Sequence, residues 1–199
     1  MKYINQLDYP DVPYITRQTL EDETERERGK YTTAATSACG LCSAIMVLDR
    51  LIPNAEFTLD EAIQMSYDAK ANLRIGTDYN KFVPVFAEKF GLEFEMTNDP
   101  DRMLYCLRTG GCAVALSTGD TKDRIGVFTH TAHYIVIINE ERDGRLAILD
   151  PANKPGKFDE PGRKGKVEVK NNICFSDVQT LLDELSHGKD PGFCLFWRK

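Results

Sequence analysis

Cysteine, histidine and aspartate side chains together perform nucleophilic catalysis, and this chain carries a cysteine in a favourable place for it. Cys39 stands at the head of a strongly apolar helical segment that begins near Ser37. Unpaired N–H groups and the macrodipole at a helix N-terminus favour a negative charge, and such positions lower a thiol pKa from about 8.5 to as low as ~3.5. We therefore predict that Cys39 is a nucleophile and that Gly40 lets a substrate backbone approach it.

Cys42 is the rival nucleophile, and its Cys-x-x-Cys spacing from Cys39 allows a second interpretation. A thioredoxin-like dithiol pair also opens a helix, but it follows a buried strand that is nearly continuous in apolar residues. Residues 21–37 are instead charged and then rich in Thr, Ala and Ser. Cys42 fits the apolar face of the helix better than Cys39 does, which favours a packing role for it. A dithiol redox protein stays open as an alternative to a hydrolase.

A third candidate is a tetrahedral zinc site whose ligands would be Cys39, Cys42, His130 and His133. The gap between the cysteines and the histidines is much longer than in a small zinc finger. Residues three apart on a strand point to opposite faces, so the two histidines should diverge. We expect no metal and no cofactor. His187, the remaining histidine, falls in a polar loop and is predicted to lie at the surface.

His133 begins an apolar strand that is followed by a turn and a second strand. Residues 140–144, which end in an Asp-Gly pair, carry the signature of a hairpin turn, so the two strands should pair antiparallel. In that register His133 faces Asp150 within one step, and the carboxylate can accept the imidazole Nδ1–H. A histidine oriented by a carboxylate is the base that a cysteine nucleophile requires. Without Cys39, a histidine at a strand start and a turn-forming Asp before proline would be the simpler interpretations.

Four blocks of the sequence resemble the bacteriocin leader-peptidase-like (peptidase C-thirty-nine-like) branch of the bacterial papain-like cysteine peptidases. The blocks are residues 4–8, 38–48, 133–137 and 149–152. The resemblance implies a papain-like fold in which Cys39 is the nucleophile, His133 the general base and Asp150 the orienting acid. It also implies that Gln6 contributes its side-chain amide to the oxyanion hole, where one donor is typically worth ~10²–10³ in turnover.

Around the proposed nucleophile, the sequence departs from the pattern that is usual in this family. The family usually has Gly-Cys-Gly where this chain has Ala38-Cys39-Gly40, and often Pro-Thr in place of Leu41-Cys42. Papains with a Cys-Gly-x-Cys block use the second cysteine, which an aromatic residue follows, whereas serine follows Cys42 here. The blocks are more specific for the fold than for the reaction, because papain-like sites also serve amidases and acyl transferases. A catalytically inactive papain-like binding domain is a further alternative.

Hydrophobic periodicity predicts a helical first half and a mostly antiparallel second half, which is an α+β fold formed by residues 1–199 as one unit. We expect a helical lobe over about 15–110, and a β-sheet lobe over about 111–199 to which the N-terminal arm adds. The expected helices cover 39–52, 58–71, 79–90, 99–109 and 176–186. The expected strands cover 112–116, 133–139, 145–149 and 192–197. Residues 18–29 are almost wholly polar and predict a solvated helix or a mobile loop.

The amino-acid composition indicates which classes of partner and which location to expect. The charges are interspersed with a net of −6, which argues against nucleic acid, and no apolar run approaches the ~20 residues of a membrane span. The polar start lacks a signal peptide, so a cytoplasmic protein with six reduced cysteines is expected. The expected substrate is a peptide or small amide, held by loops that include residues 118–128 and 155–165. The basic stretches 156–158 and 163–166 are predicted to be solvated.

Overall fold

The computed structural model describes residues 2–16, 32–72, 76–185 and 191–199. Within them the chain forms a seven-stranded sheet with antiparallel neighbours throughout, in the order β1-β7-β2-β3-β4-β6-β5. The strands are β1 (Leu92–Thr97), β2 (Cys112–Ser117), β3 (His133–Glu140), β4 (Arg145–Leu149), β5 (Glu168–Lys170), β6 (Ile173–Asp177) and β7 (Phe193–Arg198). This arrangement is α+β. The polar segment 18–29 and His187 lie outside the described residues.

The helices begin and end at local signals in the sequence. They are η1 (Gln6–Asp8), α3 (Ala34–Ser37), α4 (Cys39–Leu51), α5 (Leu59–Asp68), α6 (Tyr79–Phe90), α7 (Pro100–Arg108) and α8 (Val178–Leu182). Thr58 and Glu61 form the predicted capping box of α5, and Asp99 caps α7. Gly91 ends α6 in the left-handed region at φ 62°, which glycine adopts without steric cost.

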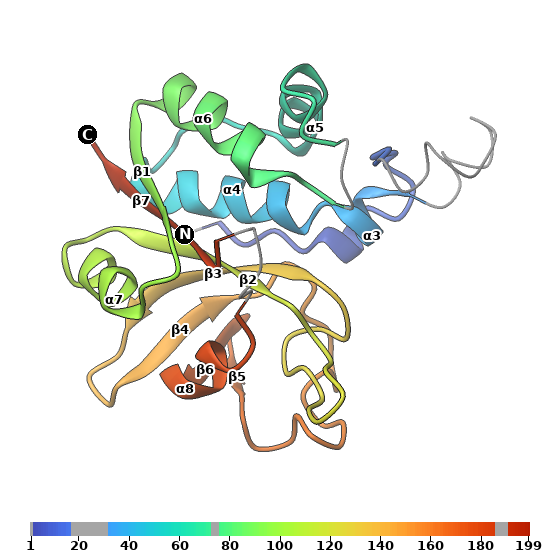
Figure 1. Cartoon of the computed structure of the whole chain (residues 1–199). Helices are drawn as coiled ribbons and strands as arrows, with labels where there is room; N and C mark the ends of the chain where they lie inside the picture. The colour runs from blue at the N-terminus through green and yellow to red at the C-terminus, as the bar shows by residue number, and fades with distance from the viewer. Residues whose placement is uncertain (1, 17–31, 73–75, 186–190) are drawn as a thin grey trace.

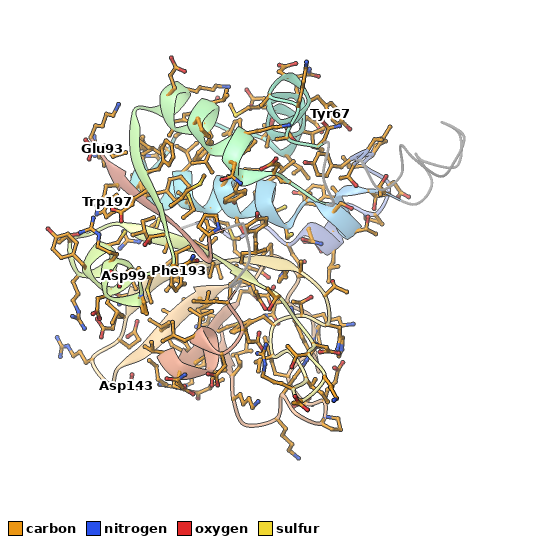
Figure 2. All side chains as sticks on the ribbon, viewed as in Figure 1. Tyr67, Glu93, Asp99, Asp143, Phe193 and Trp197 are labelled. Atoms are coloured by element: carbon orange, nitrogen blue, oxygen red, sulfur yellow. The ribbon has the colours of Figure 1, made fainter. Side chains whose placement is uncertain are left out.

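Two hydrophobic clusters cover the two faces of the sheet. Helices α4, α5 and α6 pack on one face, and α7 and α8 lie on the other (Figure 1). Side chains fill the layer between the helices and the strands (Figure 2). Along β3 the strand alternation sends Val136 to the α4 face and Ile135 and Ile137 to the opposite face. Among the described residues, no helix is long and apolar enough to cross a membrane.

The main departures from the sequence-based expectation concern short elements. Strand β1 falls inside the lobe expected to be helical, because its alternating apolar and acidic residues pair with β7 at the edge of the sheet. Strands β5 and β6 were not expected, and the first residues form the short helix η1 in addition to an extended arm. Helices α5 and α8 are shorter than predicted, because α5 ends at Asp68 and α8 spans only five residues.

Candidate active site

Cys39 is the first residue of α4, and the residue as a whole is half-buried. Burial alone would raise the pKa of this thiol. A hydrogen bond with the His133 side chain and the positive charge of that ring outweigh the burial, and backbone hydrogen bonds of Tyr134 and Gly40 act in the same direction. The net effect lowers the pKa of the Cys39 thiol below its ordinary value. The helix start therefore holds a thiol that ionises more easily than an ordinary one.

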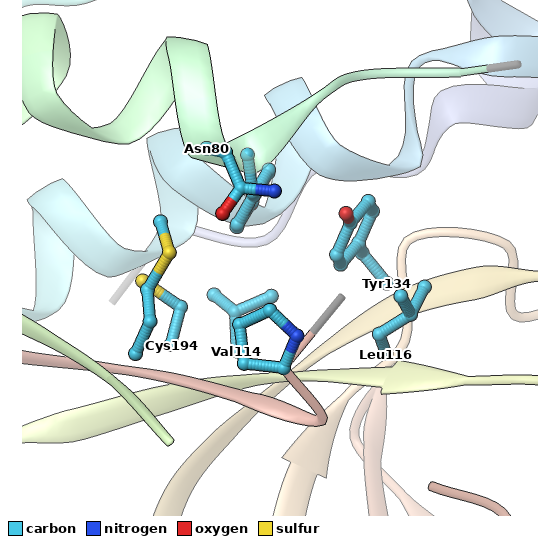
Figure 3. A pocket seen from close by; sticks show the side chains of 8 residues that line it. Asn80, Val114, Leu116, Tyr134 and Cys194 are labelled. Atoms are coloured by element: carbon cyan, nitrogen blue, oxygen red, sulfur yellow. The ribbon is translucent and has the colours of Figure 1, made fainter. Parts of the chain in front are cut away.

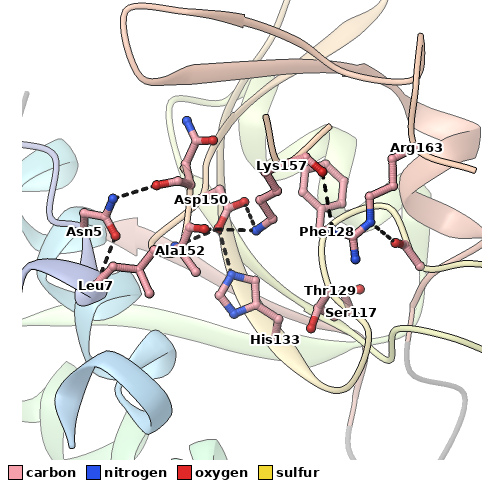
Figure 4. Close-up of polar contacts among 12 residues, drawn as sticks. Asn5, Leu7, Ser117, Phe128, Thr129, His133, Asp150, Ala152, Lys157 and Arg163 are labelled. Atoms are coloured by element: carbon pink, nitrogen blue, oxygen red, sulfur yellow. Dashed lines mark hydrogen bonds and ion pairs between the residues drawn. The ribbon is translucent and has the colours of Figure 1, made fainter. Parts of the chain in front are cut away.

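His133 is the first residue of β3, and its side chain is buried. Its Nε2 lies 2.8 Å from Asp150 Oδ1 (Figure 4). The sequence-based expectation that Asp150 would accept from Nδ1 is therefore wrong: Nε2 meets the carboxylate, which leaves Nδ1 to meet the Cys39 thiol. Burial would lower the pKa of His133, but the Asp150 carboxylate and then the Cys39 thiol oppose it and raise the pKa to about 9.

The hairpin of β3 and β4 brings His133 to Asp150 in a different register from the expected one. Val136 pairs with Leu149, so the position beside Asp150 is that of Ile135 and not that of His133. A bulge near residue 138 shifts the pairing closer to the turn. Because side chains two residues apart share a face of the sheet, His133 still reaches Asp150 as a diagonal neighbour.

Asp150 is fully buried at the end of β4 and receives donors on both carboxylate oxygens. Oδ1 accepts from His133 Nε2 and from the Ala152 backbone N–H at 2.8 Å, and Oδ2 accepts from Lys157 Nζ at 2.5 Å. Burial would raise the pKa of this carboxyl, but the positive charges of His133 and Lys157 lower it to about 2. Asp150 is thus an anion with a cation on each side.

Lys157 is the member of this group that sequence reasoning missed. The stretch 156–158 was expected to be solvated, yet Lys157 and Phe158 are both buried. Besides Asp150, the Lys157 ammonium donates to the Ala152 carbonyl at 3.3 Å. A signal was present in the sequence, because Lys157 follows Asp150 by only seven residues across a Pro-Gly turn. A lysine among glycine and proline nevertheless looks like an ordinary surface loop.

The N-terminal arm docks onto the residues that follow Asp150. Tyr3 donates its hydroxyl to the Asp150 carbonyl at 2.7 Å, and Asn5 Nδ2 donates to the Asn153 carbonyl at 2.7 Å. The backbone N–H of Gln6 donates to the Pro151 carbonyl at 2.7 Å. The arm thereby holds the turn that carries the carboxylate.

Gln6 itself is buried beside the short helix α3. Its Nε2 donates one N–H to the Ala35 carbonyl at 2.7 Å, which leaves the second N–H of the amide for another acceptor. Its Oε1 has no hydrogen-bond partner among the described residues. The amide expected at the oxyanion hole is thus fixed in place by one bond and keeps a free donor.

Gly40 has a different role from the expected one. A Cβ at this position would lie 2.9 Å from the Tyr79 ring and 3.1 Å from the Tyr134 ring, so the space beside it is already filled. These rings stack at 4.2 Å between centroids, and Tyr79 donates its hydroxyl to the Gly40 carbonyl at 2.6 Å. The glycine permits aromatic packing against the start of α4, and not the approach of a substrate backbone as predicted.

A small cavity bordered by Tyr134 lies between α6 and the sheet (Figure 3). Its volume of about 10 Å³ suits roughly one water molecule. Its walls include Val114, Leu116 and Cys194. This cavity is too small for a peptide and is a gap in the packing.

The alternative roles of the cysteines find less support in the geometry. Cys42 is buried in the core, and burial raises the pKa of its thiol well above the ordinary value. His130 does not join Cys39, because its two ring nitrogens lie 3.0 Å from Asp120 and 3.2 Å from Glu160. In the described part of the chain, no group of three or more His, Cys, Asp or Glu side chains is arranged to hold a metal ion.

An open pocket of about 250 Å³ lies beside the histidine. His133, Phe128 and Thr129 form one side, and the loop after Asp150 forms the other. The residues lining it also include Leu7, His130, Ala152, Lys154, Lys157, Glu160 and Arg163. Residues from both loops expected to hold a substrate therefore line one cavity.

One solved structure with a similar overall architecture is a crystal structure of a protein from Bacillus anthracis. That protein is provisionally described as a C39-like peptidase, where C39 is the name of a peptidase family and not a residue. The similarity covers 100% of this chain and 98% of that chain, with a TM-score of 0.52 and 10% sequence identity. No family model and no curated protein matches the sequence. The chain therefore has an α+β fold similar to that of a C39-like peptidase.

Proposed function

We propose that this protein is a thiol-dependent hydrolase of papain-like type that cleaves a peptide bond through an acyl-enzyme on Cys39. The observation that supports it most is the position of His133, whose ring interacts with the Cys39 thiol on one side and lies 2.8 Å from Asp150 Oδ1 on the other. The Cys39 thiol lies at a helix N-terminus, and the positive charges of His133 and Lys157 keep the Asp150 carboxylate ionised. A nucleophile, a base and an orienting group in hydrogen-bond contact are what covalent catalysis requires.

The reaction begins from a Cys39 thiolate and a His133 imidazolium. The thiolate attacks the carbonyl carbon of the substrate and forms a C–S bond. The Nδ1–H of His133 then passes its proton to the leaving amine as the C–N bond breaks. Neutral His133 next takes a proton from a water that attacks the acyl-enzyme. Cleavage of the C–S bond releases the carboxylic acid and restores the ion pair.

In this mechanism the charge that develops on the carbonyl oxygen is stabilised by N–H donors. The Cys39 backbone N–H lies in the first turn of α4, where backbone N–H groups have no partner within the helix. The free N–H of the Gln6 amide is the second donor. Asp150 stays ionised throughout, because its role is to orient the ring and to stabilise the imidazolium.

Alkylation of the thiols by iodoacetamide tests this proposal. At about pH 6, below the ordinary thiol pKa, the modified residues of wild type, His133→Ala and His130→Ala are mapped by mass spectrometry. We expect fast, selective labelling of Cys39 that slows in His133→Ala and not in His130→Ala, which removes a neighbouring exposed histidine. Cys42 in the same spectra reports the rate of an ordinary buried thiol.

Three outcomes would replace the proposal. Equal labelling of all cysteines only above about pH 8, near an unperturbed thiol pKa, would mean that no thiol is activated. A reversible disulfide between Cys39 and Cys42 would support the dithiol redox protein. Selective labelling of Cys39 without turnover of any peptide or amide would point to an inactive papain-like binding domain.

A further inference from the structure

Arg163 has a buried guanidinium nitrogen that nothing in the fold uses. The side chain is only 4% exposed, and its Nε donates to the Gly126 carbonyl at 2.7 Å. Its Nη1 lies 3.4 Å from the Lys157 carbonyl and 3.2 Å from Glu160 Oε2. Its Nη2 has no acceptor among the described residues. Because buried donors are nearly always paired, an unpaired one that lines a cavity calls for a ligand.

Figure 4 shows this nitrogen directed away from the two bonded carbonyls and toward Thr129. Arg163 and Thr129 both line the 250 Å³ pocket beside His133. The three bonded contacts hold the guanidinium rigidly, so its free edge presents N–H donors without further loss of side-chain freedom. The pocket is therefore lined by an arginine that keeps one buried, unused hydrogen-bond donor.

The charge around the pocket is positive on balance. Three basic side chains line it, namely Lys154, Lys157 and Arg163, against one carboxylate, Glu160. Lys157 is matched by Asp150, and Glu160 matches one positive charge at most. Lys154 is exposed and has no ion pair within the described part of the chain. One positive charge is left over, and a guanidinium and an ammonium together suit a carboxylate.

The pocket lies on the leaving-group side of the proposed reaction. His133 lines it, and Cys39 does not. Because the imidazolium must protonate the leaving amine, the part of the substrate that carries this amine has to lie next to His133. A group seated in the pocket therefore belongs to the amine product and not to the acyl part.

We propose that this pocket binds a carboxylate on the amine side of the substrate, either an acidic side chain or the C-terminal carboxylate of a short peptide. The assignment rests on the proposed function for the side of the bond, and on Arg163 and Lys154 for the chemistry. It makes the substrate class peptides that carry a negative charge shortly after the cleaved bond.

Transfer of an acyl group from the enzyme to an amine tests whether this pocket binds a carboxylate. The acyl part of the natural substrate need not be known for this experiment. The enzyme is acetylated with p-nitrophenyl acetate, and its capture by three amine nucleophiles is compared: glycyl-glutamine amide, glycyl-glutamate amide and glycyl-glutamine with a free C-terminus. We expect one of the two carboxylate-bearing peptides to be acetylated about tenfold more efficiently than the neutral amide. The side-chain or the terminal carboxylate is identified by which peptide gains.

Variants of the basic residues test whether the pocket causes the preference for carboxylate-bearing peptides. Arg163→Gln should abolish it, and Lys154→Gln should reduce it about twofold to threefold, since an exposed charge is partly screened. Lys164→Gln removes an equal charge from an exposed position of the same loop and should leave the preference intact. If Arg163→Gln does not fold, Lys154→Gln and the loss of the preference at high salt still decide the matter.

Equal capture of all three peptides by an enzyme that forms the acetyl-enzyme would overturn the pocket assignment and leave the proposed function standing. Failure to form any acetyl-enzyme would contradict the proposed function instead. In that case, calorimetric titration of the Cys39→Ala protein with the same three peptides tests the pocket by binding alone. Tighter binding of a carboxylate-bearing peptide would support the assignment, and equal or undetectable binding of all three would refute it.

Discussion

Two fully buried carboxylates contact residues that face each other on β2 and β3, and they have different kinds of partner. Asp150 contacts His133, and Glu184 contacts Ser117, the residue directly opposite His133 in the pairing of β2 with β3. Both acids hold a loop against the same end of the sheet. Their surroundings differ because an imidazole is among the donors to Asp150 and none is among the donors to Glu184.

The partners of Glu184 keep their protons. Its carboxylate accepts from the Ser117 hydroxyl at 3.0 Å and from the backbone N–H groups of Val127 and Phe128, and it pairs with Arg124 at 3.2 Å. Hydroxyl, amide and guanidinium groups do not titrate near neutral pH. Glu184 therefore fixes the loop that ends in the wall of the pocket. Asp150, by contrast, has an imidazole as a partner, so in the proposed reaction the same kind of buried acid controls a proton.

The sharpest test of this contrast is Asp150→Asn. The amide keeps the size of the side chain but removes the charge that orients His133 and stabilises its imidazolium. We expect kcat/KM to fall by about 10²–10⁴, as when the acid of a comparable triad is neutralised. Steady-state kinetics on any substrate found for the wild type measure it. A loss of less than about threefold would mean that Asp150 serves the fold alone.

Glu184→Gln should lower the stability of the fold without affecting the active-site thiol. Removing this charge leaves the half-buried Arg124 without its ion pair and weakens two backbone hydrogen bonds to a fully buried side chain, so we expect the free energy of unfolding to fall by about 3 kcal/mol. Urea denaturation measures the loss, and Glu93→Gln, at an exposed position, is the matched control. The alkylation midpoint of Cys39 should not move. A shifted midpoint at unchanged stability would reverse the roles given to the two acids.

Lys157→Met tests whether the buried lysine supports the carboxylate. Asp150 keeps His133 and the Ala152 N–H, so we expect the free energy of unfolding to fall by about 2–3 kcal/mol, less than for an acid left alone. The pKa of Asp150, about 2 against the ordinary 3.8, should rise. A carboxyl with a lowered pKa stabilises the fold above its unfolded pKa and loses that effect as the pH falls through the folded pKa.

Acid unfolding measures this effect of Lys157. The variant should unfold at a higher pH than the wild type, while Lys164→Met, an exposed neighbour, should not. An unchanged acid midpoint in Lys157→Met would show that His133 alone keeps the carboxylate ionised.

The pH dependence of two reactions distinguishes the role of the His133 proton from that of the Cys39 thiolate, with a smaller expected effect. The pKa of His133 is raised to about 9, so the imidazolium is present below that pH and is lost above it. Hydrolysis of an amide needs this proton, and alkylation needs only the thiolate. Amide turnover should therefore fall about tenfold per pH unit above pH 9, while alkylation of Cys39 stays fast. Parallel decline of both rates would argue against His133 as the proton donor.

Local signals made much of the fold predictable. The capping box at Thr58, the glycine stop of α6 and the apolar runs of β2 and β3 each depend on a few neighbouring residues. The alternation of apolar and acidic residues in β1 is a strand signal, but the strand is short and lies between two predicted helices. Strand β5 has three exposed residues, so its sequence holds no periodic pattern, and only pairing with β6 defines it.

The site was predictable where it depends on one hairpin, and not where it depends on distant loops. Proximity of His133 to Asp150 follows from the hairpin, but the bulge in β3 changed the register, and the ring presents Nε2 and not Nδ1 to the acid. Burial of Lys157 and Arg163 depends on partners contributed by other loops, which no local pattern reveals. Charged residues beside glycine and proline resemble a solvated loop until the partners are known.

Titration of His133, followed by NMR of the imidazole carbons, tests directly whether Cys39 and His133 form a thiolate–imidazolium pair. Only three histidines occur in the chain, so His133→Ala assigns the signal. We expect His133 to stay protonated up to about pH 9 in the wild type, and we expect its pKa to fall in Asp150→Asn and in Cys39→Ser, because both partners raise it. Titration at the ordinary 6.5, unchanged by either substitution, would contradict a thiolate–imidazolium pair held by Asp150.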